Sequence, residues 1–456
     1  MLRANSRLHT KLGEHGVALL AYAAGSIERI LPHVEPISWT EGIWQPAKTV
    51  WIDSKRQGIR ITLAFGAGAD QSDRSLTAIV RRRKLSIAGG AGNTLDSRER
   101  DICERIAKRI SDLAAQLASS PITDLASIRA IRGSFDEAVI AEHIREHHDF
   151  DVQVGSILAA LHTLSEQTYE NKALVFGCVI DPDEDNNGIA ANFPEPFLTA
   201  KKYKALSDGF RTAYHVSRDG AVIDFVDLDR IDTQQLSSRH YYPEWADSIA
   251  RVSRRRRCGI SLTRQGDILV FDEGALRFTY RFGRWRYWNH AHVVNLLRNR
   301  ARAQRVPPSI VGHVVGSIYR TALDISFRRS GGLFVVLHNQ KDVHEMVRTG
   351  DAIGDPGRRQ DDRDFDGVIE RHKMQSLPRA VAVEIASLDG AVVLANSGRI
   401  LAYGAVLQPR KAGKIRGSEG SRTKAAIGAS MYGLAVKISS DGDITVYYDG
   451  SEFFRI

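Results

Sequence analysis

The sequence of 456 residues predicts an α/β protein with two or three domains, the last of which is a mixed-sheet α/β domain at residues 306–456. Three observations carry this prediction. The chain is too long for one ordinary hydrophobic core. Its composition, 43% hydrophobic and 26% charged residues, is that of a globular protein. In the C-terminal third, strand-like apolar runs alternate with segments of helical period. One or two α+β domains are expected ahead of it.

The first domain is predicted at residues 1–125 as an α/β domain. Its strand-like segments, 49–52 and 59–63, precede a clear amphipathic helix. A Ser-Ser-Pro break at residues 119–121 ends the domain. In the helix, apolar residues recur every three or four positions and form one stripe, made of Ile102, Ile106, Ile110, Leu113 and Leu117.

The middle domain, residues 126–305, is predicted as an α+β domain. Helical periods occupy residues 137–147 and 154–170, and a buried strand at 173–180 leads into an acidic loop. We expect this loop, residues 181–188, to be solvated, because it lacks the glycine and the closing glutamate of a calcium-binding loop.

Further along, the middle domain combines arginines with aromatic residues. Alternation at residues 268–282 predicts a β-hairpin, and Arg284–Trp288 continues it with cations opposite aromatic rings. The run Arg254–Arg257 lies upstream. A nucleic-acid interpretation would place the arginines on phosphates and the rings against bases. The interpretation that we favour is a sheet with one packed face and a solvated run of charge.

The C-terminal domain begins after a Pro-Pro pair with a helix whose apolar residues repeat from Ile310 to Leu323. A short helical piece is expected at 343–348. The segment 350–371, dense in Asp, Arg and Gly, is expected to be a mobile surface loop. A further helix should start near Arg422. Strands are predicted at 333–337, 380–385, 391–395, 400–407, 434–438 and 444–448.

Composition and charge narrow the class of protein. The longest apolar run, 16–25, is far shorter than the roughly twenty residues that span a bilayer, and Glu14 and His15 interrupt a secretory signal pattern. The three cysteines are far apart and lack CxxC spacing, which argues against a disulfide framework or a zinc site. We therefore expect a cytoplasmic protein with no membrane span. The net charge of +9 suits an anionic partner, and charge alone does not choose among a nucleotide, nucleic acid and a membrane surface.

Two short motifs in the C-terminal domain combine into a candidate metal and phosphate site. Asp389-Gly390-Ala391 places a carboxylate in a turn at the start of a strand, where a divalent cation can be held. Further along the chain, Gly420-Ser421-Arg422-Thr423-Lys424 places hydroxyls and two cations at the start of a helix, whose free N–H groups attract anions. A metal-holding acid that faces a phosphate cradle is the minimum for phosphoryl or nucleotidyl transfer.

The first motif is a weak signal by itself. Asp219-Gly220-Ala221 repeats it before another predicted strand, with no Gly-Ser-Arg partner at a matching distance. The Asp-Gly pair suits a turn for conformational reasons alone. The prediction therefore depends on the two motifs together and on the order of elements around them.

That order resembles the diadenylate cyclase (DAC) family over the C-terminal third of the chain only. The signatures of the family are an Asp-Gly-Ala turn and a Gly-Thr-Arg-His-Arg helix start, commonly followed by Ala-Ala and a Ser-Glu pair. This sequence has its own versions of both motifs, and Ala425-Ala426 and Ser430 follow the second. A sensor-type N-terminal region ahead of a cyclase domain also resembles one domain arrangement of the family.

The resemblance implies that two ATP molecules are condensed into cyclic di-AMP, a second messenger, with release of pyrophosphate. Asp389 would be the catalytic residue and would hold Mg²⁺ or Mn²⁺. Each site would supply one ATP, so two subunits must face each other and at least a transient homodimer is implied. The substrate-binding residues would be Gly390, Ala391, Gly420, Ser421, Arg422, Thr423, Lys424 and Ser430, with Leu407 beside the adenine.

Three positions depart from the family pattern. Leu388, Thr423 and Met431 stand where strongly active members usually carry His, His and Glu. Two interpretations therefore stay open beside an active cyclase controlled by sensor domains. One is a catalytically weak or inactive nucleotide-binding regulatory protein of the same fold. The other, which we do not favour, is a signalling protein gated by nucleic acid through Arg254–Arg257.

Overall fold

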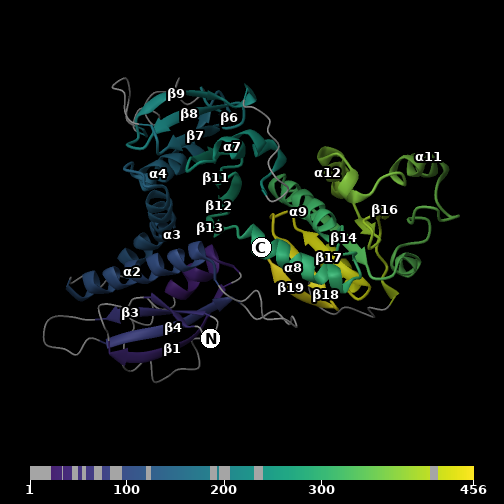
Figure 1. Ribbon diagram of the computed structural model, residues 1–456, viewed down its shortest axis with the longest axis horizontal. Coiled ribbons are helices and arrows are strands. Elements are labelled where there is room, and N and C mark those ends of the chain that lie inside the picture. The colour runs from purple at the N-terminus through teal and green to yellow at the C-terminus, as the bar shows by residue number, and fades with distance from the viewer. Residues whose placement is uncertain are drawn as a thin grey trace. The chain divides into compact units, whose positions relative to one another are not determined.

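The computed structural model describes residues 22–32, 34–43, 50–53, 58–65, 74–82, 95–119, 125–184, 193–194, 206–230, 240–410 and 420–456 (Figure 1). Contacts divide the chain into two compact units. The first unit comprises Met1–Gln235 and Ser248–Trp288, and the second comprises Leu236–Asp247 and Asn289–Ile456. The predicted division into domains at residues 125 and 305 stays a prediction.

A four-stranded antiparallel sheet with the strand order β1-β4-β3-β2 opens the first unit. The predicted amphipathic helix is α2 (Ser97–Ser119), which packs against β3. Ile102, Ile106 and Ile110 are buried, as their spacing on one stripe predicts. The strands are β1 (Val34–Ile43), β2 (Val50–Asp53), β3 (Gly58–Phe65) and β4 (Arg74–Arg82).

Two further helices, α3 (Leu125–His148) and α4 (Val154–Ser165), connect this sheet to the next in the chain. The helix predicted at 154–170 therefore ends earlier than expected, and a two-stranded ribbon of β5 (Thr168–Tyr169) and β6 (Lys172–Ala173) follows it. The buried strand expected at 173–180 begins later, at β7 (Phe176–Asp181).

A seven-stranded sheet with the order β13-β12-β11-β10-β7-β8-β9 completes the first unit. Strands β7 and β8 run parallel, and the other neighbours run antiparallel. The predicted hairpin is confirmed as β11 (Ile268–Asp272) and β12 (Ala275–Arg281). The remaining strands are β8 (Thr212–Ser217), β9 (Val222–Asp227), β10 (Cys258–Leu262) and β13 (Arg284–Tyr287), with η2 (Leu228–Arg230) after β9.

The second unit contains a mixed six-stranded sheet with the order β16-β15-β14-β17-β18-β19, which confirms the predicted mixed α/β fold (Figure 1). Strands β14 and β15 are parallel and the other pairs antiparallel. Every residue of β14 is buried, as expected for a central strand covered on both faces. The strands are β14 (Gly332–Leu337), β15 (Ala391–Leu394), β16 (Ile400–Ala405), β17 (Gly433–Ile438), β18 (Ile444–Tyr448) and β19 (Ser451–Arg455).

Helices cover both faces of this sheet. Successive side chains of a strand point to opposite faces. Val336 of β14 lines a small cavity with Val314 and Ile318 of α9, while Val335 shares a core cluster with Ala426 of α13. The helices of the second unit are α8 (His290–Ala303), α9 (Val311–Phe327), α10 (Val343–Met346), α11 (Gln360–Ile369), α12 (Arg379–Ser387) and α13 (Ser421–Ala429). The short elements of the second unit are η3 (Glu244–Ala246), η4 (Gln340–Asp342) and η5 (Met374–Ser376), while α7 (Asp247–Val252) belongs to the first unit from Ser248 on.

One predicted strand is wrong, because residues 380–385 belong to helix α12. An apolar run of Ala and Val fits a buried strand and a buried helix equally well in periodicity. The helix begins directly after Pro378, a residue that suits a helix start. Arg379 in its first turn pairs with Asp324 of α9 at 2.7 Å, which fixes the helix against α9.

The prediction of a mobile surface loop at 350–371 is also wrong, because this segment contains α11. Its charged residues pair with each other inside the segment. Arg358 contacts Asp366 through Nε at 2.5 Å and Nη2 at 2.8 Å, and both side chains are buried. The hydroxyl of Tyr403 donates to the same carboxylate at 2.9 Å. A composition typical of a solvated loop here forms a helix that is held by one buried ion pair.

The acidic segment predicted to be solvated begins with a buried residue. Asp181 is 1% exposed and contacts Arg257 at 2.5 Å and His215 at 3.3 Å. The prediction is therefore wrong at Asp181, and residues 185–188 lie outside the described part of the chain.

The three cysteines are buried and not joined in disulfides. Within the described ranges, no helix has both the length and the apolar character to cross a membrane.

Candidate functional site

The Asp-Gly-Ala motif forms a tight turn between α12 and β15. Gly390 has a φ of 121°, a conformation that side-chain-bearing residues rarely adopt. A Cβ atom at this position would lie 2.4 Å from the carbonyl carbon of Gly404 on β16. Glycine is therefore required both by the backbone angle and by the close approach of two strands. Asp389, just before it, is fully exposed at the end of the sheet.

The second motif begins helix α13, as predicted. Gly420 is the N-cap residue and makes no side-chain capping bond, so the first N–H groups of the helix have no capping side chain. Ser421 is exposed at this end, and Lys424 is half-buried one turn later. Free N–H groups together with the helix dipole favour an anion at this place.

The two motifs meet in space through Asp389 and Arg422. An Nη2 atom of Arg422 lies 3.8 Å from Oδ1 of Asp389. The guanidinium also rests on the backbone of Gly331, where a Cβ would lie 1.9 Å from Nη1. Gly331, just before β14, is thus a residue of the site that the sequence did not indicate. An exposed ion pair of this kind contributes little to stability. It matters because it brings the two motifs together in space.

Thr423 has a partner within the unit. Its Oγ1 accepts a hydrogen bond from Nζ of Lys437 on β17 at 2.9 Å. Burial, with the nearby positive charge of Arg455, lowers the pKa of Lys437. Lys437 was not predicted as a site residue, since a lysine within a strand carries no motif. It places a further cation behind the start of α13.

Ser430 holds α13 to the turn between β18 and β19. It is 3% exposed, and its Oγ donates to the carbonyl of Ile427 at 2.7 Å and accepts from the N–H of Gly450 at 2.9 Å. Both bonds lie inside the unit, so the geometry gives this hydroxyl a structural role. Its predicted role in substrate binding stays a prediction.

Leu407 lies just beyond β16 and is half-buried against the core cluster of the sheet. Its segment is fixed by backbone bonds, from Arg348 N to Val406 O at 2.9 Å and from Gln408 N to Met346 O at 2.6 Å. The strand that ends here also carries Gly404, which contacts the Asp389 turn. The structure thus places Leu407 two residues beyond the strand that contacts the turn, and its contact with a base stays a prediction.

Residues 320–452 match the family model described as "DisA bacterial checkpoint controller nucleotide-binding", which is abbreviated DAC. The C-terminal third of this chain is a DAC domain. The match includes Gly331, both motifs and Lys437. It covers the whole of the six-stranded sheet except the end of β19.

Two solved structures are similar to parts of the chain. One is described as the hypothetical membrane spanning protein from Bacillus cereus, at 20% identity and a TM-score of 0.25, covering 36% of this chain and 74% of that one. The other is a double cysteine variant of DacA from Staphylococcus aureus, at 22% identity and a TM-score of 0.22, covering 30% and 83%. At these TM-scores neither likeness adds to the family assignment. No curated protein matches the chain.

Among the described residues of the two motifs, Asp389 provides the one carboxylate at their meeting point. Within the described residues, the sole group of three or more neighbouring His, Cys, Asp and Glu side chains lies in the first unit instead. A single carboxylate fits Mg²⁺ or Mn²⁺ that is held mainly by phosphate oxygens and water. Divalent metals are general in DAC-family cyclases, and the residues here are compatible with such an ion.

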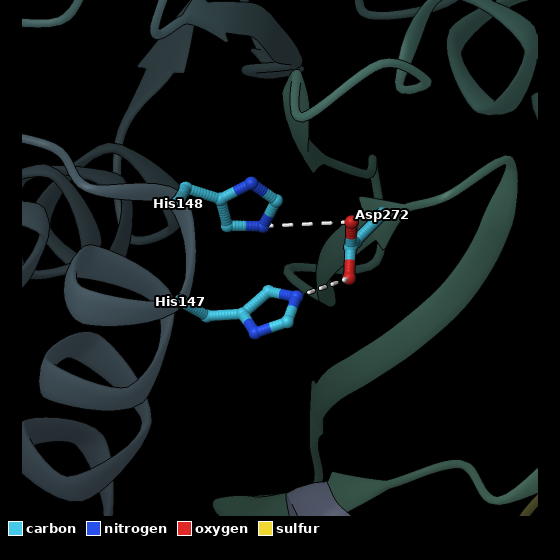
Figure 2. A group of neighbouring side chains, drawn as sticks. All are labelled: His147, His148 and Asp272. Atoms are coloured by element: carbon cyan, nitrogen blue, oxygen red, sulfur yellow. Dashed lines mark ion pairs between the residues drawn. The ribbon is translucent and has the colours of Figure 1, made fainter.

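The cluster in the first unit consists of His147, His148 and Asp272 (Figure 2). Arg98 of α2 contacts the same carboxylate and lies 3.0 Å from Nε2 of His147. Burial lowers the pKa of His148, and burial together with the charge of Arg98 lowers that of His147 to about 4. Sequence analysis missed this cluster, because only the His-His pair is visible as a local signal.

The structure does not support the predicted stacking of aromatic side chains on nucleic-acid bases. Trp285, Tyr287 and Trp288 are each at most 3% exposed, so their rings pack in the interior and cannot stack on bases. Arg257 is paired with Asp181. The predicted alternation of cations and aromatic rings is therefore a sheet with a packed face, as we favoured. Binding of nucleic acid by Arg254–Arg257 stays an unfavoured prediction.

Proposed function

We propose that the DAC domain condenses two ATP molecules into cyclic di-AMP and releases pyrophosphate. The observation that carries this proposal is the meeting of Asp389 with Arg422. Two motifs distant in sequence bring a carboxylate, a guanidinium and a helix N-terminus to one end of the sheet. This arrangement suits a reaction in which a hydroxyl attacks a phosphate.

In each half-reaction the 3′-oxygen of one ATP forms a bond to the α-phosphorus of the other, and the bond to pyrophosphate breaks. A divalent ion held by Asp389 and phosphate oxygens, Mg²⁺ or Mn²⁺, would make the hydroxyl a better nucleophile. Arg422, Lys424 and the Ser421 hydroxyl would bind the phosphates beside the free N–H groups of α13. The turn at Gly390 and Ala391 would bring backbone close to the nucleotide, with Leu407 towards the base.

Each domain supplies one ATP, so we expect two chains to face each other through their DAC domains, at least transiently. The upstream residues would control this pairing as sensor domains. Because the substrate is ATP, we place the protein in the cytoplasm. The pairing of two domains is part of the proposed reaction, whereas the sensor role and the cytoplasmic location are independent of the chemistry at Asp389.

A second candidate is a regulatory protein that binds ATP without turnover. Specific residues favour it. Strongly active family members usually carry polar groups at positions 388 and 431. Here Leu388, next to Asp389, is apolar and 47% exposed, and Met431, beyond the C-terminal end of α13, is apolar and 43% exposed. The Thr423 hydroxyl is bonded to Lys437. A loss of polar groups around the phosphates slows phosphoryl chemistry more than it weakens binding of ATP.

One experiment separates the two candidates. The full chain is incubated with ATP and Mn²⁺ or Mg²⁺, and cyclic di-AMP is quantified by mass spectrometry, with Asp389→Asn as the matched variant. ATP binding is measured in parallel by calorimetry. We expect product from the parent and none from the variant. Binding without product under either ion would establish the regulatory candidate, and absence of both would refute a nucleotide site.

A further inference from the structure

The His147, His148 and Asp272 cluster lies inside the first unit and has no part in the proposed chemistry. His147 and His148 end helix α3, and Asp272 ends strand β11 (Figure 2). His148 and Asp272 are each 3% exposed, while the side chain of His147 is 38% exposed and gives access from solvent. A carboxylate buried with two imidazoles is costly unless a positive charge accompanies it.

The protonation of the His148 ring also indicates that a cation is needed beside Asp272. Its Nδ1 lies 2.6 Å from the carbonyl oxygen of Arg256, so Nδ1 carries the proton and donates. In the neutral ring the lone pair on Nε2 then faces Oδ1 of Asp272 at 3.5 Å. Two electron-rich atoms that face each other at this distance repel unless a cation lies between them. A bond from the second ring nitrogen to a carbonyl is the usual support of a metal-binding histidine.

The separations within the cluster also suit a metal ion. Nε2 of His147 lies 3.8 Å from Oδ2 of Asp272, and Nε2 of His148 lies 3.5 Å from Oδ1 of the same carboxylate. These distances are longer than good hydrogen bonds. They are close to the separation of about 3.3 Å between ligands in a tetrahedral Zn²⁺ site with bonds of about 2.0 Å.

Arg98 supplies the positive charge in this structure. Its guanidinium contacts Asp272 and donates towards Nε2 of His147, and it also reaches Oε2 of Glu273 at 3.0 Å. Glu273 is an exposed second partner of Arg98. Arg98 can keep this contact when a metal cation displaces it from Asp272. Nη1 of Arg98 and Oδ2 of Asp272 are both buried and pair with each other.

We propose that His147, His148 and Asp272 bind one divalent transition-metal ion of the Zn²⁺ class, with Arg98 releasing Asp272 and keeping its contact with Glu273. Two nitrogen ligands and one oxygen ligand favour Zn²⁺ or Co²⁺ over Mg²⁺. Three protein ligands leave a fourth position for water. The sequence argued against a zinc site on the evidence of cysteines, and this site contains none.

The test uses the full chain, freed of any histidine tag and stripped of metal. Zn²⁺ is titrated in competition with a chromophoric chelator, and Co²⁺ is added separately to record its visible absorption. We expect His147→Ala to remove one bound equivalent, or to weaken it at least about tenfold. The matched control is His162→Ala, since His162 pairs with Glu137 at 2.5 Å outside the cluster. The Co²⁺ spectrum should show tetrahedral bands that are lost in His147→Ala only.

Arg98→Met separates a metal site from a purely structural ion pair. If Arg98 competes with the metal, removal of its charge should tighten Zn²⁺ binding about tenfold or more. Equal Zn²⁺ binding by the parent, His147→Ala and His162→Ala would overturn the proposal, as would a parent that binds no Zn²⁺. If Arg98→Met fails to fold, the comparison of the two histidine variants still decides. None of these readouts depends on cyclic di-AMP.

Discussion

Two Asp–Arg pairs in this chain differ in one property, exposure, and the difference separates charges that hold the fold from charges that can meet a ligand. Arg98 and Asp272 have side chains that are 10% and 4% exposed. Arg422 and Asp389 are 36% and 106% exposed, and lie 3.8 Å apart. The first pair is surrounded by protein on nearly every side. The second leaves its carboxylate open to solvent and to substrate.

In the buried pair, the charge of Asp272 depends on the positively charged groups around it. Burial alone would raise the pKa of Asp272, but the charge and hydrogen bond of Arg98, together with the charges of His148 and Arg277, outweigh burial and lower the pKa. Removal of either partner therefore leaves an uncompensated charge in the interior. At the exposed pair, water can replace either partner. The following predictions test this contrast from the largest effect to the smallest.

The largest effect is expected for Asp272→Asn in metal-free protein. It leaves Arg98 buried without its main counter-charge, so the free energy of unfolding should fall by about 3–5 kcal/mol. Urea unfolding followed by circular dichroism measures this loss. The adjacent and exposed Glu273→Gln is the control and should change stability by no more than about 0.5 kcal/mol. Equal losses in both variants would contradict the contrast.

Gly390→Ala should cost about 2–3 kcal/mol, because the new Cβ would meet the backbone of Gly404 at a φ of 121°. The alanine would also push apart β15 and β16 beside Asp389. Gly367 in α11 offers a matched control, since a Cβ there meets nothing within 4 Å. Gly367→Ala should be neutral or slightly stabilising. Thermal unfolding of both variants makes the comparison, and a harmless Gly390→Ala would show that the turn is not constrained.

Gly331→Ala should act on the site and leave the fold almost unchanged. Its Cβ would displace the flexible end of Arg422, so we expect a decrease of about tenfold in kcat/KM, equivalent to about 1.4 kcal/mol, with little change in Tm. The double variant with Arg422→Ala should be no worse than Arg422→Ala alone. Additive losses would mean that Gly331 acts by another route.

The smallest effect concerns pH. Burial acts to raise the pKa of Asp101, but bonds with His143 and Arg105 lower it to about 2 from 3.8. A carboxylate with a depressed pKa contributes stability that is present above pH 3.8 and is lost as the pH falls towards 2. The stability difference between the parent and Asp101→Asn should therefore shrink across this window. Urea midpoints at pH 4, 3 and 2.5 measure it, with Asp112→Asn as a control substitution at an exposed position of the same helix.

The sequence predicted the parts of the second unit that repeat a local pattern. The buried strand β14, the start of α13 and the paired motifs follow from apolar periodicity and from residues that favour turns and caps. Helix α12 was predicted as a strand because an Ala-Val run is ambiguous. Helix α11 was predicted as a loop because its stability comes from Arg358 and Asp366, a pairing that composition conceals.

The residues missed at the sites share one cause. Gly331 and Lys437 carry no motif, and their roles come from contacts with side chains far away in the sequence. Arg98 and Asp272 belong to α2 and β11, and their pairing depends on how the first unit packs. Such contacts between residues distant in sequence cannot be predicted from the spacing of residues along the chain. The predicted site residues, in contrast, lie in two contiguous motifs.

The most direct test of the central claim measures both activity and stability in Asp389→Asn. An exposed carboxylate that serves chemistry should be dispensable for folding. We predict that the variant makes at least about 100-fold less cyclic di-AMP than the parent, with a free energy of unfolding within about 0.5 kcal/mol of it. Cyclic di-AMP formed by Asp389→Asn at the parent rate would contradict the assignment of Asp389 as the catalytic residue.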